Sequence, residues 1–348
     1  MGTSLSSTFV GAFAFFAALI LSVGGIDLFR RLSTKKNWLD HPNERSTHTH
    51  PTPRGAGVVI VIVSLSIYTA AAIALKGQPS WGYVVGAILV ALISWLDDLY
   101  SLAYLSRLGV HCLAAILVVV DAGYLHVFGV SESYSIDLDF VGAMITTVWI
   151  VWSINAYNFM DGIDGLAGIQ GVVAASIWAV LTLAIPQLFV FNIALTGACF
   201  GFLIHNWPPA RVFLGDVGSA FLGFTFGAMA VLFAKQTTAD LAMLPVVAIL
   251  VLWPFNFDAG LTRLGKALRL EKFWEPHRDH IYQKLTLAGF SAGFVSALYG
   301  LMALAAGLAA IALLTSNKWS AFFLVVVILL ISFTLAVMTK RLGRPARS

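Results

Sequence analysis

The chain has 348 residues, of which 59% are apolar and only 11% are charged, and its formal net charge is +4. Soluble domains carry about 25% charged residues, so this composition excludes an ordinary soluble protein. Cys112 and Cys199 both lie inside apolar runs, which excludes a disulfide framework and a cysteine metal cluster. Apolar runs of about 20 residues recur along the chain and predict an all-α integral membrane protein.

Eleven apolar runs are candidate transmembrane helices, and we expect them to form one bundle that spans residues 1–348 as a single domain. The first run has no basic residue before it, and four basic residues follow it. This pattern is typical of a retained anchor with its N-terminus outside, rather than of a cleaved signal peptide. The expected spans are 8–28, 56–76, 81–97, 107–127, 140–157, 165–185, 188–206, 217–234, 242–260, 289–314 and 319–339.

The basic residues predict the orientation of the bundle. If successive spans alternate in direction, 18 of the 21 Lys and Arg residues fall on one side, and only Lys76, Lys235 and Lys318 fall on the other. The positive-inside rule makes the first side the cytoplasm, with the C-terminus there as well. The polar loops then all face the cytoplasm and form one active site: 30–55, 97–106, 155–165, 205–217 and 261–288. On the outside, segment 128–139 alternates polar and apolar residues and predicts a small hairpin.

One polar motif places asparagines and aspartates at every third position between two apolar runs: Asn155, Asn158, Asp161 and Asp164. Residues three apart share a helix face, and carboxylates beside a membrane are costly and usually functional. Glycines that follow with the same step leave room for a ligand. The structural alternative is a polar interhelical loop with glycine caps, which does not need paired acids at this spacing.

Three further carboxylates lie at the ends of apolar runs. Asp97 and Asp98 are adjacent, so they repel each other unless one is protonated or a cation lies between them. Asp216 lies in a Gly-Asp-Val-Gly-Ser stretch, with Asn206 upstream, and its oxygens suit Mg²⁺. The structural alternatives are a helix end in water for the first pair and a helix cap for Asp216.

Two basic loops complete the polar set. Arg45 and Arg54 lie in a proline-stiffened loop before a helix start, where forked donors and backbone N–H groups favour a phosphate. His277, Arg278 and His280 concentrate donors in the second loop. Positive charge that only orients the bundle is the structural alternative for both loops.

Carboxylates and basic loops on one face are both satisfied by a substrate that combines a divalent metal with a diphosphate. A lipid acceptor at the membrane surface would make the reaction a phosphoryl transfer. The competing class is a transporter or flippase of nucleotide-linked or lipid-linked sugars. Transporters hold their ionisable groups near the membrane midplane, often in two related halves, and neither feature is present in this sequence.

The five motifs, in this order, resemble those of the polyprenyl-phosphate N-acetylhexosamine-1-phosphate transferases of glycosyltransferase family 4. The resemblance extends from about Asp40 to Leu285. It implies transfer of a sugar 1-phosphate from a UDP-sugar to undecaprenyl phosphate, with release of UMP and with Mg²⁺, or Mn²⁺ in its place, as cofactor. It also implies a bacterial inner membrane enzyme that initiates O-antigen or related cell-envelope glycan synthesis.

The resemblance also implies residue roles. Asp216 resembles the metal ligand, and Asp97 resembles the group that prepares the lipid phosphate, with Asp98 beside it. Asp161 and Asp164 resemble acids on the nucleotide and metal side of the site. We expect substrate contacts from Arg45, Arg54, Asn155, Asn158, Asn206, His277, Arg278 and His280.

The second basic loop departs from the pattern of relatives that use UDP-GlcNAc. Those relatives often have a run of histidines, whereas this chain reads His280-Ile-Tyr282-Gln283. The loop is more similar to the branch that uses 6-deoxy sugars such as FucNAc or QuiNAc. The sequence leaves open the exact sugar, a one-step or covalent mechanism, and whether the chain forms a homodimer; it indicates no nucleic-acid partner.

Overall fold

The protein is described by a computed structural model that covers residues 2–40, 50–75, 77–131, 134–237, 241–269, 279–315 and 318–342. In chain order, the elements are α1 (Gly2–Lys36), β1 (Leu39–Asp40), β2 (Thr52–Pro53), α2 (Gly57–Ala74), α3 (Trp81–Tyr100), α4 (Tyr104–Ala122), β3 (Val127–Ser131), β4 (Tyr134–Asp137), α5 (Asp139–Met160), α6 (Leu166–Leu181), α7 (Pro186–Asn206), α8 (Gly215–Ala234), α9 (Leu244–Val251), α10 (Trp253–Leu268), α11 (Ile281–Leu287), α12 (Ala292–Leu314) and α13 (Lys318–Leu342).

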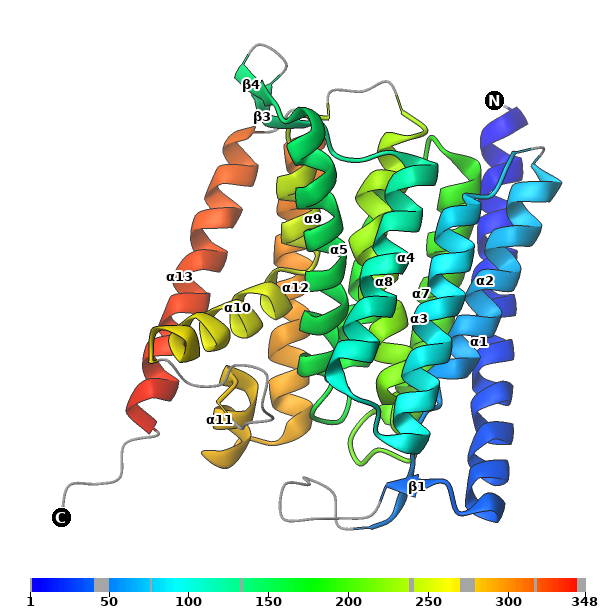
Figure 1. Cartoon of the computed structure of the whole chain (residues 1–348), viewed down its shortest axis with the longest axis vertical. Helices are drawn as coiled ribbons and strands as arrows, with labels where there is room; N and C mark the ends of the chain where they lie inside the picture. Colours follow the sequence, from blue (N-terminus) through cyan, green and yellow to red (C-terminus); the bar gives the residue numbers. More distant parts are fainter. Residues whose placement is uncertain are drawn as a thin grey trace.

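The helices form an upright bundle, which confirms the predicted all-helical membrane fold (Figure 1). Among the described residues, nine helices are long and apolar enough to cross a membrane, or ten if the bent pair α9–α10 counts as one span. The start of α1 and the end of α13 lie at opposite ends of the bundle (Figure 1). Which end faces the cytoplasm stays a prediction from the charges.

Two of the eleven expected spans do not form a straight helix that is long enough to cross a membrane. α6 has 16 residues and is therefore about 24 Å long, shorter than the hydrocarbon core of a bilayer. The apolar run 242–260 does not form one straight helix, because α9 and α10 meet at an angle of 84°. Pro254 lies in the first turn of α10 and cannot donate the backbone hydrogen bond that would continue α9.

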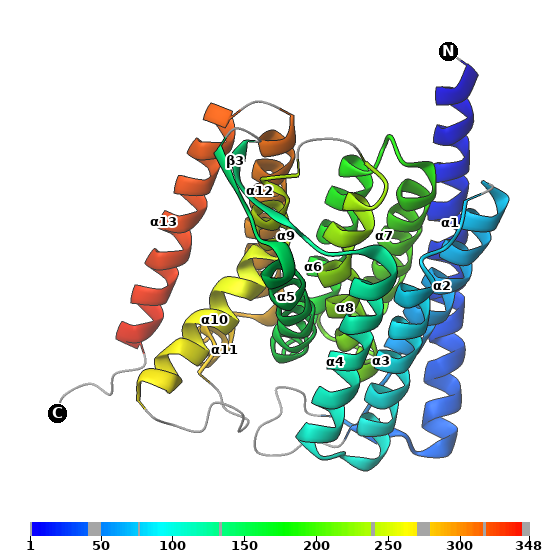
Figure 2. The same cartoon turned by 45° about the horizontal axis from the view of Figure 1, so that its top comes forward.

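The helix α8 forms the centre of the bundle. Its span is 94% buried inside the protein, whereas those of α1 and α13 are 28% and 17% buried. Figures 1 and 2 show these two helices on opposite flanks. The side chains of α8 are apolar or small except Asp216 in its first turn, so the whole helix can be enclosed without burying other charges.

The two ends of the bundle carry different structures. The strands β3 and β4 pair antiparallel at the upper end in Figure 1, as predicted for 128–139. At the opposite end, β1 pairs with β2, with Leu39 opposite Pro53. The ends of α3 and α5 and the start of α8 lie at this same end of the bundle, so the polar motifs gather there (Figure 1).

Candidate active site

Two of the predicted functional loops meet through their backbones. The N–H of Gly57 donates to the carbonyl of Leu214 at 2.9 Å. A Cβ atom on Gly57 would lie 2.2 Å from the Cα of Gly218, so this approach requires glycine. The contact brings the loop that contains Arg54 against the first turn of α8.

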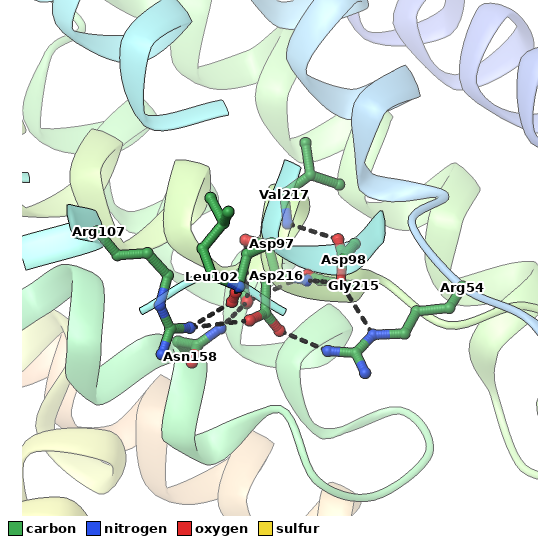
Figure 3. A network of polar contacts seen from close by, with 10 residues as sticks. Arg54, Asp97, Asp98, Leu102, Arg107, Asn158, Gly215, Asp216 and Val217 are labelled. Atoms are coloured by element: carbon green, nitrogen blue, oxygen red, sulfur yellow. Dashed lines mark hydrogen bonds and ion pairs between the residues drawn. The ribbon is translucent and has the colours of Figure 1, made fainter. Parts of the chain in front are cut away.

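The carboxylate of Asp98 caps α8 from the neighbouring helix α3. It accepts hydrogen bonds from the N–H of Asp216 at 3.0 Å and of Val217 at 3.1 Å (Figure 3). Its Oδ1 also lies 2.9 Å from Nε of Arg54. A carboxylate at a helix N-terminus satisfies unpaired N–H groups and meets the positive end of the helix dipole. The cap of α8 is therefore Asp98, and not Asp216 as the structural alternative proposed.

Asp97 and Asp216 share the guanidinium of Arg107. Its Nη1 contacts Oδ2 of Asp97 and lies 3.4 Å from Oδ2 of Asp216. Nη2 of Arg54 lies 2.7 Å from Oδ1 of Asp216. Three carboxylates and two guanidinium groups thus form one network, and each arginine bridges two acids. We call Arg54, Asp97, Asp98, Arg107 and Asp216 the carboxylate–arginine cluster.

Asp161, directly after α5, interacts electrostatically with the charged groups of this cluster. The pKa of Asp161 is raised to about 7, mainly by burial; Arg54 lowers it, and the nearby charges of Asp216, Asp98 and Asp164 contribute to the rise. For Arg54, burial lowers the pKa, but the carboxylates of Asp216 and Asp98 outweigh it, so its pKa is raised and the guanidinium stays charged.

Replacement of Asp161 by asparagine should stabilise the protein, and by more at pH 8 than at pH 5. The folded state holds a proton that the unfolded state releases near pH 3.8, so the free energy of unfolding falls as pH rises from about 4 to about 7. The variant removes this loss, which is of the order of a few kcal/mol. Apparent unfolding temperatures of both proteins across this range test it; an equal difference at both pH values would contradict it.

A cavity of about 360 Å³ opens beside the carboxylate–arginine cluster, within the size range of small-molecule sites. Helices α3, α4, α5, α8 and α10 and the α11 region contribute to it. Its polar lining comprises Ser94, Tyr104, Arg107, His111, Asn155, Asn158, Asp216, Arg263, His280, Tyr282 and Gln283.

A buried carboxylate, Asp258 of α10, holds α11 at the wall of this cavity. It accepts hydrogen bonds from the N–H of Ile281 at 2.9 Å, the N–H of Tyr282 at 3.1 Å and the hydroxyl of Tyr299 at 2.6 Å. Nδ1 of His280 lies 3.1 Å from its Oδ1. The bend between α9 and α10 thus places Asp258 where it orients two cavity residues.

Replacement of Asp258 by alanine should lower activity by about 10²-fold, because loss of the shared acceptor displaces His280 and Tyr282 from the cavity wall. The readout is product formation, together with amide exchange of residues 281–287. Asp279→Ala changes an exposed acid next to the same helix and serves as control. Normal activity with unchanged exchange in the Asp258 variant would contradict the assigned role.

The structure brings several predicted residues together and gives others a supporting position. Asn155 and Asn158 line the cavity, and Asn158 donates to Oγ of Ser219 at 2.9 Å. Asn206 is buried and joins two loops: it accepts from the N–H of Gly165 and donates to the carbonyl of Val212, both at 2.9 Å.

Asp164 also contacts a loop. Its Oδ2 accepts from the N–H of Ala210 at 2.9 Å. This carboxylate is not among the residues that line the cavity in the described part of the chain. Arg45, His277 and Arg278 lie outside the described residues.

The oxygen ligands of the carboxylate–arginine cluster show whether it could hold Mg²⁺. Within the described residues, no three His, Cys, Asp or Glu side chains form a group that could hold a metal alone. Mg²⁺ is commonly held by one or two carboxylates, with substrate phosphates and water completing the shell. Asp97 and Asp216 both direct an oxygen at one guanidinium, so two carboxylates converge on positive charge. This donor set fits such a partial protein shell.

The chain is similar to several proteins of known name. It is 26% identical over 335 residues to a "Probable undecaprenyl-phosphate N-acetylglucosaminyl 1-phosphate transferase" of Bacillus subtilis, covering 94% of this chain and 91% of that protein. Two matches are to proteins named "Phospho-N-acetylmuramoyl-pentapeptide-transferase". One, from Synechococcus, is 35% identical over 134 residues, or 37% of each chain. The other, from Moorella thermoacetica, is 50% identical over 52 residues, covering 15% of this chain and 16% of that protein.

The model of the family described as "Glycosyl transferase family 4" matches residues 80–234. Over this region, the chain is similar to glycosyl transferase family 4. This confirms the predicted resemblance. The family-4 match runs from the start of α3 to the end of α8 and contains Asp97, Asp98, Arg107 and Asp216. Arg54 of the carboxylate–arginine cluster lies before it.

Sequence reasoning did not single out Arg107 and His111 of α4. They are one helical turn apart and both line the cavity. His111 is 6% exposed, and neither ring nitrogen has a hydrogen-bond partner among the described residues. An ionisable pair at this spacing inside an apolar run was the signal that could have revealed them.

Proposed function

We propose that the protein transfers a sugar 1-phosphate from a UDP-activated N-acetylhexosamine to undecaprenyl phosphate. The carboxylate–arginine cluster beside a cavity, at one end of a membrane bundle, carries this proposal. The match to the family model and the printed name of the Bacillus relative support the acceptor and the phosphoryl chemistry. The lipid tail would lie against apolar helix faces in the bilayer, while its phosphate reaches the cluster.

In the proposed reaction, an oxygen of the lipid phosphate attacks the β-phosphorus of the UDP-sugar. The bond from this phosphorus to the bridging oxygen breaks, and UMP leaves with that oxygen. The product is a lipid diphosphate sugar. Such transfers depend mainly on positioning and on electrostatic stabilisation, which agrees with a site built from charged groups.

The residues have proposed roles that follow their positions. Asp216, with Asp97 close by, would hold Mg²⁺ or Mn²⁺, and a bound divalent ion neutralises charge on the phosphates. Arg107 reaches the cavity and would bind a phosphate. Asn155 and Asn158 would contact the nucleotide sugar. Asp97 would prepare the acceptor, because the oxygens of Asp98 are taken up by the start of α8 and by Arg54.

The identity of the sugar is also a proposal. His280, Tyr282 and Gln283 line the cavity, so the loop that departs from the histidine-rich pattern faces the substrate position. This supports a 6-deoxy sugar such as FucNAc or QuiNAc, with GlcNAc as the second candidate. The basic residues support a bacterial cytoplasmic membrane location with the site facing the cytoplasm.

A direct assay tests the function. Purified protein, undecaprenyl phosphate and Mg²⁺ are incubated with a panel of UDP-sugars, and UMP and lipid-linked product are measured. We expect equal amounts of both with at least one N-acetylated sugar. If no sugar yields UMP, the transferase proposal is wrong; uptake of a sugar nucleotide into liposomes without UMP would then favour a transporter.

A further inference from the structure

A second cavity of about 340 Å³ lies between α10, α11 and α13, at the lower left in Figure 1. Among the described residues, its lining has no member in common with that of the candidate active site. We call it the α13 cavity. Its apolar wall includes Phe333, Ala336 and Val337 of α13.

The charged residues of the α13 cavity favour an anion. In the described part of the chain, its charged lining consists of Arg269, Lys284, Lys340 and one acid, Asp279. This acid lies 3.6 Å from Nζ of Lys266, outside the lining, so its charge is already offset. Among the described residues, Lys284 and Lys340 therefore face a cavity whose one lining carboxylate already contacts Lys266.

The α13 cavity also lies at the level expected for lipid headgroups. Lys340 is the last residue of the apolar span Trp319–Lys340, and basic side chains at the end of a span reach the headgroup region. Leu264 and Leu268 of α10 and Phe333 of α13 are exposed beside it. A soluble anion would make no use of these apolar side chains, and a purely apolar ligand would make no use of Lys284 and Lys340.

We propose that the α13 cavity binds the headgroup of an anionic phospholipid. Phosphate oxygens would accept hydrogen bonds from Arg269, Lys284 and Lys340, and the acyl chains would lie along the exposed faces of α10 and α13. Basic pockets between membrane helices are known to take such headgroups. The inference does not depend on the proposed function.

A bound lipid would act on the candidate active site through α11. His280, Tyr282 and Gln283 line the active-site cavity, whereas Ile281 and Lys284 line the α13 cavity. One short helix is thus the wall between the two. The lipid would hold this wall in place from outside.

The test uses the full chain and the double variant Lys284→Gln/Lys340→Gln. Protein is incubated with mixtures of phosphatidylglycerol and phosphatidylcholine, and retained lipid is counted by native mass spectrometry. We expect wild type to retain phosphatidylglycerol preferentially. The preference should fall about 30-fold in the double variant, or about five-fold per lysine. Amide exchange of residues 281–287 should slow in phosphatidylglycerol nanodiscs for wild type only.

The matched control is Lys35→Gln/Lys36→Gln, which removes the same charge from the end of α1 on the opposite flank (Figure 1). It should keep the lipid preference. An unchanged preference in the α13-cavity variant would overturn the proposal. Displacement of phosphatidylglycerol by an equal amount of polyprenyl phosphate would also overturn it, by assigning the cavity to the acceptor lipid. No turnover is measured, so this result is independent of the transferase assay.

Discussion

Replacement of Asp216 by asparagine should lower turnover by at least about 10²–10³-fold while the protein stays folded. Asp216 is where both arginines of the carboxylate–arginine cluster converge, and it lines the cavity. The amide keeps the shape of the side chain but loses the charge that would hold a divalent ion against substrate phosphates. Arg54 keeps its contact with Asp98, and Arg107 keeps its contact with Asp97, so neither cation is left alone.

The measurement is UMP release as a function of Mg²⁺ concentration, with an apparent unfolding temperature for each protein. Asp137→Asn makes the same change in an exposed strand at the other end of the bundle and should leave both quantities unchanged. Wild-type activity with wild-type Mg²⁺ dependence in Asp216→Asn would remove this residue from the proposed metal site.

Replacement of Asp98 by alanine should destabilise the fold as well as abolish activity. The side chain is 6% exposed and serves three donors: two N–H groups of α8 and the guanidinium of Arg54. Removal of one partner from such a buried ionic contact costs about 3–5 kcal/mol. For a chain of this size, we expect the apparent unfolding temperature to fall by about 10 °C.

The control for Asp98 is a more exposed acid that also pairs with arginines. Asp27 pairs with Arg30 and Arg31 on the surface of α1, and surface pairs contribute about 0–1 kcal/mol. Asp27→Ala should therefore shift the unfolding temperature by no more than about 2 °C. If both variants unfold at the same temperature, Asp98 does not anchor the start of α8.

Several features could be predicted because they depend on local pattern. Long apolar runs with few charges predicted membrane helices, since a buried backbone in lipid must satisfy its own hydrogen bonds. Alternating polarity predicted the hairpin of β3 and β4. The expected meeting of segments 97–106, 155–165 and 205–217 also followed from span order, because alternating helices return the chain to the same end.

Other features depend on contacts between distant segments. Asp97 and Asp98 are adjacent in the sequence, and only their partners in the fold distinguish their roles. Asp97 contacts Arg107, whereas Asp98 accepts hydrogen bonds from the start of α8. Asp258 gained its importance from the 84° bend that turns α10 toward α11, which hydropathy does not reveal.

The sequence by itself determined the membrane class, the family motifs and the end of the bundle at which they gather, because hydropathy and charge act along the chain. Only the tertiary structure decided which carboxylates face the cavity and which fasten helices together. The physical reason is that the two oxygens of a carboxylate accept only a few hydrogen bonds. Its role therefore depends on the donors that neighbouring helices bring to it. In Asp98, those donors are the N–H groups of α8 and the guanidinium of Arg54.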